Sequence, residues 1–98
     1  MSYSFRAALW RWKGDAPASW VFVTLPAEVA FAIRAEASAV PRAWGSVKVR
    51  AAIGDVEWTT SLFPQKDTGL YLLPVKAAVR NALRLDDGDE VEVRLCPI

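Results

Sequence analysis

The feature that most constrains the fold is a plan that occurs twice along the chain. The first copy reads WVFVTLP, a helical stretch, a Gly-containing turn and VKVRA, and the second reads GLYLLP, a helical stretch, a Gly-containing turn and VEVRL. Each copy is therefore a strand that ends in Leu-Pro, a helix, and a strand with valines at alternate positions. The helix residues do not align, so the architecture repeats more than the sequence. We predict two β-α-β halves related by a pseudo-twofold axis.

Alternating apolar residues predict strands over 3–12, 19–25, 46–53, 56–63, 70–73 and 91–95. Pro26 and Pro74 suit the start of a helix, where the missing N–H costs nothing, and we predict helices over 26–38 and 75–85. A closed barrel is the economical arrangement because closure removes exposed sheet edges. The predicted fold class is mainly β with two short helices: one small closed β-barrel domain over residues 1–98.

The absence of histidine narrows the chemistry. It excludes Ser-His-Asp and Cys-His catalysis and histidine-containing zinc sites. A single cysteine, Cys96, can form neither an internal disulfide nor a thiolate metal cluster, and the sequence suggests no role for it. We expect no cofactor.

Charge and hydropathy bear on partners and location. The net charge of +1 argues against strong nonspecific binding to nucleic acid or to a membrane, because both need a large basic excess. Residues 1–12 lack the apolar core of a secretion signal, and no apolar run approaches the roughly 18 residues that cross a bilayer. With one cysteine, these features favour a cytoplasmic protein without membrane contact.

Several stretches resemble one bacterial family, catalogued as "domain of unknown function 1905". They cover essentially the whole chain in order: WVFVTLP, WGSVKVRAAI, WTTSLFPQKDTGLYLLPVKAAVRNAL and DDGDEVEVRL. The resemblance implies a double-split β-barrel, similar in architecture to the AbrB and MazE group of regulators and antitoxins, and it implies no assigned activity. That group is expected to need two chains per barrel, whereas the internal repeat lets one chain close its own. We predict a monomer, with weak dimerisation through exposed aromatics as the alternative.

The two predicted helix starts differ in charge. Glu28 complements the positive end of the first helix dipole, whereas Lys76 stands at the same place in the second. Lys76 and Arg80 lie on one helical stripe and predict an anion site there. The alternatives are that a protein carboxylate such as Asp67 or Glu57 pairs with Lys76, or that Lys76 reaches solvent.

A hydroxyl run precedes Lys66. Serine with a lysine base is a known nucleophile pairing, but the S-x-x-K spacing is absent around Ser61. Hydroxyls in a strand more often satisfy neighbouring backbone groups or face water.

The tryptophans offer stacking surfaces. We place Trp10 and Trp12 on opposite strand faces, so that at least one is partly exposed and available to a base, a sugar or a partner. Trp20 and Trp58 are predicted in the core and Trp44 as a plug at a barrel end. The alternative is that tryptophans line a ligand cleft.

The leading prediction is a non-enzymatic binding module. Its site is the surface of TTSLFPQKDTG and the start of the second helix, and its ligand is an anionic small molecule. The candidate ligand-binding residues are Trp44, Trp58, Ser61, Lys66, Lys76 and Arg80. One alternative is a DNA-binding regulator or antitoxin of the AbrB or MazE type, against which the acidic stretch DDGDEVE argues. The other is a hydrolytic enzyme that uses Ser61 with Lys66 or Lys76.

Overall fold

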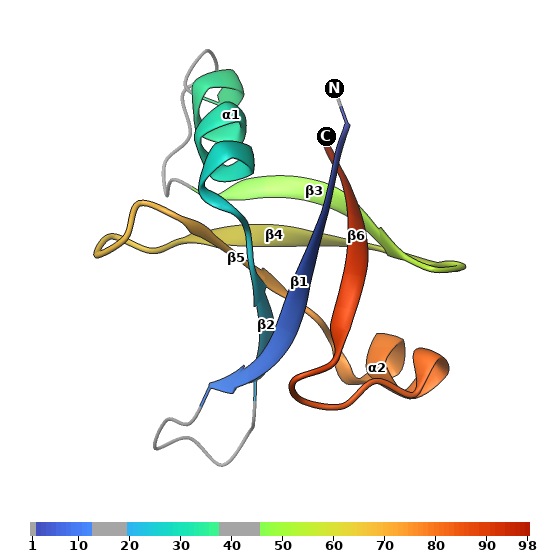
Figure 1. Cartoon of the computed structure of the whole chain (residues 1–98). Coiled ribbons are helices and arrows are strands. Elements are labelled where there is room, and N and C mark those ends of the chain that lie inside the picture. Colours follow the sequence, from blue (N-terminus) through green and yellow to red (C-terminus); the bar gives the residue numbers. More distant parts are fainter. Residues whose placement is uncertain (1, 13–19, 38–45) are drawn as a thin grey trace.

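The computed structural model describes residues 2–12, 20–37 and 46–98, which form six strands and two helices. In chain order the elements are β1 (Tyr3–Trp12), β2 (Trp20–Thr24), α1 (Ala27–Ala37), β3 (Val47–Ile53), β4 (Val56–Pro64), β5 (Tyr71–Pro74), α2 (Ala77–Leu83) and β6 (Glu90–Pro97). The strands close into a barrel in the order β1-β2-β5-β4-β3-β6, and every neighbouring pair is antiparallel (Figure 1). The predicted small closed β-barrel is confirmed.

The strand order carries the predicted twofold symmetry. Exchanging β1 with β4, β2 with β5, and β3 with β6 leaves every neighbour relation in the barrel unchanged. In the β2–β5 ladder Thr24 stands opposite Leu72, with Val23 opposite Leu73 on one side. On the other side the Leu25 N–H donates to the Tyr71 carbonyl oxygen at 3.0 Å. A single chain thus supplies both halves and leaves no open sheet edge.

The core is filled by the inward face of each strand and by one face of each helix. Alternate positions of β6 are buried, as period-two geometry requires, and β3 follows the same alternation from Val47 to Ala51, after which Ala52 is buried as well. The two helices lie on opposite sides of the barrel (Figure 1). The helical contribution to the core comes from Val29, Ala30 and Ile33 of α1 and from Val79 of α2, with Val75 just before it.

The second helix is shorter than the predicted range 75–85. The Val75 N–H donates to the Val21 carbonyl oxygen at 2.9 Å, so Val75 still belongs to the strand ladder. Lys76 is the N-cap, with extended backbone (φ −69°, ψ 159°) and no side-chain cap. At the other end Arg84 adopts the left-handed conformation (φ 54°, ψ 48°) and stops the helix.

Two predictions about the tryptophans are wrong. Trp10 and Trp12 share the outer face of β1, because residues two apart in a strand point to the same side, and they stand opposite Phe22 and Trp20. Trp20 is 48 % exposed rather than in the core, because Val21 takes the inward position of β2.

In the part of the chain that the structure describes, no helix is long and apolar enough to cross a membrane.

Candidate functional site

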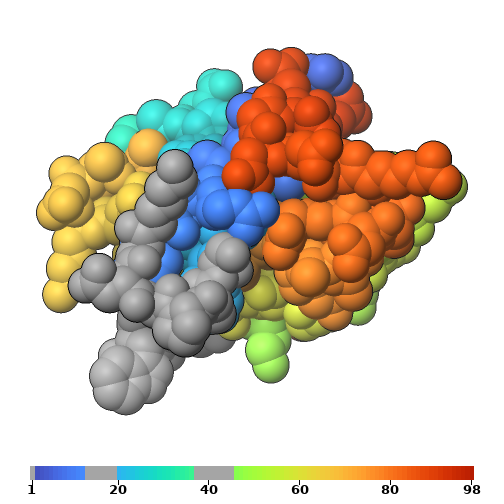
Figure 2. Space-filling model, turned by 90° about the horizontal axis from the view of Figure 1, so that it is seen from below, coloured from blue at the N-terminus to red at the C-terminus, as the bar shows by residue number. Residues whose placement is uncertain are grey.

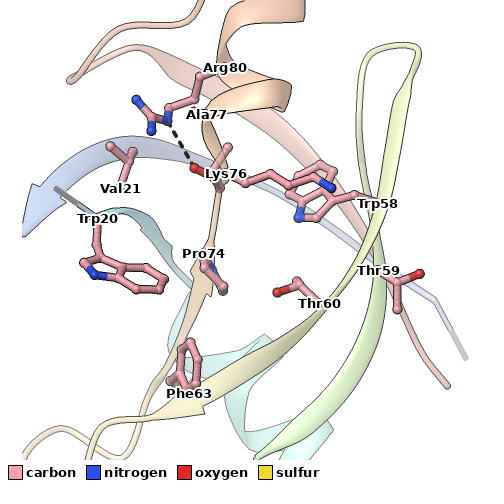
Figure 3. Close-up of a pocket in the computed structure, with 11 residues that line it drawn as sticks. Trp20, Val21, Trp58, Thr59, Thr60, Phe63, Pro74, Lys76, Ala77 and Arg80 are labelled. Carbon is pink, nitrogen blue, oxygen red and sulfur yellow. Dashed lines mark hydrogen bonds between the residues drawn. The ribbon is translucent and has the colours of Figure 1, made fainter. Parts of the chain in front are cut away.

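A pocket opens where the start of α2 meets β2, β4 and β5 (Figure 3). Its volume is about 370 Å³, within the lower range of small-molecule sites. We call it the cationic pocket. Its lining residues are Trp20, Val21, Trp58, Thr59, Thr60, Phe63, Pro74, Val75, Lys76, Ala77 and Arg80.

Aromatic rings and a proline form the walls of the cationic pocket. Trp20 and Phe63 are exposed at 48 % and 44 %, so each presents ring surface to the opening. Pro74 lies between them and Trp58 in Figure 3, and the Thr60 hydroxyl points toward the same space. The walls therefore combine apolar area with the Thr60 hydroxyl, the usual character of a ligand site.

Lys76 and Arg80 give the pocket its positive charge. Arg80 is held in place, since its Nε donates to the Val75 carbonyl oxygen at 3.1 Å. In Figure 3 its guanidinium lies on the other side of the start of α2 from the Lys76 side chain, which extends toward Trp58. Lys76 is exposed. No acidic residue is among the described residues that line the pocket, and none of the described ion pairs involves either cation.

The protein carboxylates that we considered for Lys76 lie elsewhere. Asp67 is exposed in the turn between β4 and β5. Glu57 borders a separate hollow together with Arg50 and Arg94. Within the described residues, no carboxylate occupies the position predicted for an anion.

Trp58 adds a hydrogen-bond donor that has no acceptor. The residue is 94 % buried, and its Nε1–H finds no partner among the described residues. In Figure 3 the indole nitrogen faces the pocket, on the side toward which Lys76 extends. By contrast, the Trp10 Nε1–H donates to the Thr24 hydroxyl oxygen at 2.9 Å. A buried donor without an acceptor is unusual and marks a place where an acceptor is missing.

The structure brings together three of the predicted site residues, Trp58, Lys76 and Arg80. It does not bring in Ser61, which lies opposite Lys48 of β3, or Lys66, which is exposed in the turn after β4. Neither lines the pocket, and no described hydrogen bond joins them, so the nucleophile hypothesis has no geometric support. Trp44 lies outside the described residues.

Sequence analysis missed Trp20 and Phe63 as pocket residues. Their outward position follows from strand alternation once Val21 and Leu62 are assigned inward. That signal was present in the sequence. The sequence did not show that Trp20 and Phe63 lie close together, because this depends on β5 lying between β2 and β4.

A second hollow of about 350 Å³ adjoins the first on the outer wall of the barrel. It shares Trp20 and Phe63 with the cationic pocket, and we call it the aromatic hollow. Its lining residues are Trp10, Trp12, Trp20, Phe22, Phe63, Gln65 and Leu72. Trp20 and Phe22 are stacked at 6.2 Å between ring centroids, and Trp10 and Phe22 are tilted at 5.4 Å. These rings form a continuous stacking surface.

The arrangement supplies groups that can bind an anion and a ring. Two cations and an indole N–H can receive negative charge, and ring faces can receive a planar group. Among residues 2–12, 20–37 and 46–98, no group of three His, Cys, Asp or Glu side chains is placed to hold a metal ion.

The fold and this pocket define a small, single-chain antiparallel barrel with a surface cleft beside a short helix. The chain belongs to the family described as "Domain of unknown function (DUF1905)", which matches residues 5–95 and confirms the resemblance seen in the sequence. No curated protein matches the chain in a sequence comparison.

Proposed function

We propose that this protein is a binding module for an anionic small molecule and that the cationic pocket is its site. One observation carries the proposal: the pocket gathers Lys76, Arg80 and the unpartnered Trp58 N–H, while its described lining residues include no acid. An anion supplies the acceptor that the described residues do not provide for the Trp58 N–H. Hydrogen bonds between charged donors and anionic oxygens are roughly twice as strong as neutral ones.

The shape and apolar walls of the pocket favour some anions over others. Trp20, Phe63 and Pro74 restrict the opening with apolar surface, so a fully hydrated inorganic ion would leave that surface uncovered. An organic anion covers it and gains the hydrophobic contribution as well. We therefore assign the site to an organic phosphate or carboxylate.

A thermal-shift screen with organic phosphates and carboxylates, followed by calorimetry on each hit, tests the proposal. We expect at least one compound to raise the melting temperature, since a ligand that binds only the folded state stabilises it. Lys76→Ala should weaken binding of that compound by about fivefold or more, because a charge-assisted hydrogen bond is lost. The affinity should also fall with added salt.

Lys66→Ala is the matched control. It removes the same charge from an exposed lysine that does not line the pocket. It should leave the affinity within about twofold of the original value. The proposal fails if no anion in the screen stabilises the protein, or if Lys66→Ala weakens binding as much as Lys76→Ala does.

A further inference from the structure

The aromatic hollow continues the cationic pocket. Trp20 and Phe63 line both, so a ligand anchored at one can extend into the other without leaving the surface. The two volumes, about 370 and 350 Å³, together suit a ligand larger than a simple anion. In Figure 2, α2 and the ends of β1 and β2 lie on the same face of the molecule.

The two hollows differ in chemistry. Both cations belong to the cationic pocket, whereas the side chains that line the aromatic hollow are uncharged throughout its described part. Gln65 is the polar side chain among those lining residues, and it can both donate and accept a hydrogen bond. The ligand that complements this pattern has negative charge at one end and a planar, uncharged ring at the other.

The exposed rings support the same conclusion. Trp12 and Trp20 are 43 % and 48 % exposed, and they stand opposite each other in neighbouring strands. A folded domain gains little from leaving such rings in water, whereas a planar ligand ring stacks on them. Base–aromatic stacking contributes to binding without a need for hydrogen-bond recognition.

We infer that the ligand is an aromatic ring that carries an anionic group, of the nucleoside monophosphate or aryl carboxylate type. The anion lies against Lys76 and the Trp58 N–H, and the ring stacks at Trp20, where the two hollows meet. This inference rests on the proposed function, because it takes the cationic pocket as the anion site and specifies what is attached to the anion.

Calorimetry with AMP, ribose 5-phosphate and adenosine separates the two parts of the ligand. AMP should bind about tenfold more tightly than ribose 5-phosphate, since stacking of one base is added. Adenosine should bind more weakly than AMP, because it lacks the phosphate. Indole-3-acetate distinguishes the two candidate ligand classes. If it binds more tightly than AMP, the ligand is of the aryl carboxylate type; if it binds more weakly, the ligand is of the nucleotide type.

Variants of Trp20 localise the ring. Trp20→Leu should lower the affinity for the tighter of the two ring ligands by roughly tenfold and that for ribose 5-phosphate by much less, because apolar area stays at the pocket opening and the stacking face is lost. Trp20→Phe should keep most of the affinity for that ring ligand. Since Trp20 is half exposed, the fold should survive, and circular dichroism checks this.

Two results would contradict this inference while leaving the proposed function in place. One is equal affinity for ribose 5-phosphate and both ring ligands. The other is a Trp20→Leu variant that changes only the molar mass in solution, which would make the aromatic hollow a self-association face. Failure of every anion, ribose 5-phosphate included, would instead remove the proposed function itself.

Discussion

At the scale of the residue, the two parts of the Trp58 side chain have different roles: the ring contributes to folding, and the N–H is available for binding. Its ring projects from β4 into the core, yet its N–H has no acceptor among the described residues. An unmet buried donor costs about 1–3 kcal/mol. Trp58 therefore stabilises the barrel by its apolar area and weakens it by its polar group, and an anionic ligand would remove the second effect.

Trp58→Phe tests this account. The change removes the unpartnered donor and part of the ring, so the two effects oppose each other. We expect the free energy of unfolding to change by less than about 1 kcal/mol in urea denaturation. Leu62→Ala, at a fully buried position of the same strand, should lose about 2–5 kcal/mol. A loss above about 3 kcal/mol for Trp58→Phe would mean that the N–H is satisfied in solution.

At the scale of the element, α2 depends on its surroundings. Seven residues are too few for a helix that is stable by itself. Lys76 provides no side-chain cap at its start, and Arg84 bears a left-handed conformation at its end, where glycine is favoured. Val75 and Val79 hold the helix by packing into the core. Tertiary contacts rather than local propensity thus place Lys76 and Arg80 at the pocket.

Arg84→Gly should stabilise the protein by about 0.5–1 kcal/mol. Glycine adopts a positive φ without the steric cost that a side chain incurs. The measurement is the shift in the urea midpoint at constant slope. Arg84→Ala is the control, because it removes the same side chain and keeps the strain. Equal effects of the two changes would show that backbone strain is not the cause.

At the scale of the whole molecule, one chain closes the barrel with two similar halves. The turn at 86–89 lies against β1 (Figure 2), where Gly88 and Asp89 bond to the Leu9 backbone. Arg11 binds Asp87 there through two hydrogen bonds, of 2.8 and 3.1 Å. The acidic residues of this turn would repel the phosphates of an approaching DNA duplex. We therefore favour the small-molecule site over the DNA-binding alternative.

We predict a monomer of 10.8 kDa in solution, because no partner strand is needed to complete the sheet. Size-exclusion chromatography with light scattering measures the mass over a range of concentrations. Any rise at high concentration should be reduced by Trp12→Ser, which removes an exposed ring of the aromatic hollow. A stable dimer at the lowest concentration measured would contradict the prediction.

Most of the fold was predictable from the sequence. The inward positions of β3 and β6 follow from valines at alternate residues, and the two Leu-Pro steps locate where strands give way to helices. The starting point of α2 was not predictable, because Val75 is kept in the ladder by a hydrogen bond to β2. The candidate site was half predictable: Lys76 and Arg80 follow from one stripe, whereas Trp20 and Phe63 belong to strands far apart in sequence.

The sequence by itself determined the alternation, the repeat, the absence of histidine and the presence of a cation, Lys76, at the start of the second helix. These are properties of residues and their near neighbours, which periodicity and composition express directly. Only the tertiary structure decided that β5 lies between β2 and β4, and therefore that Trp20 and Phe63 meet Lys76 at one pocket. Strand order is settled by closing the barrel, a global requirement that no local pattern records.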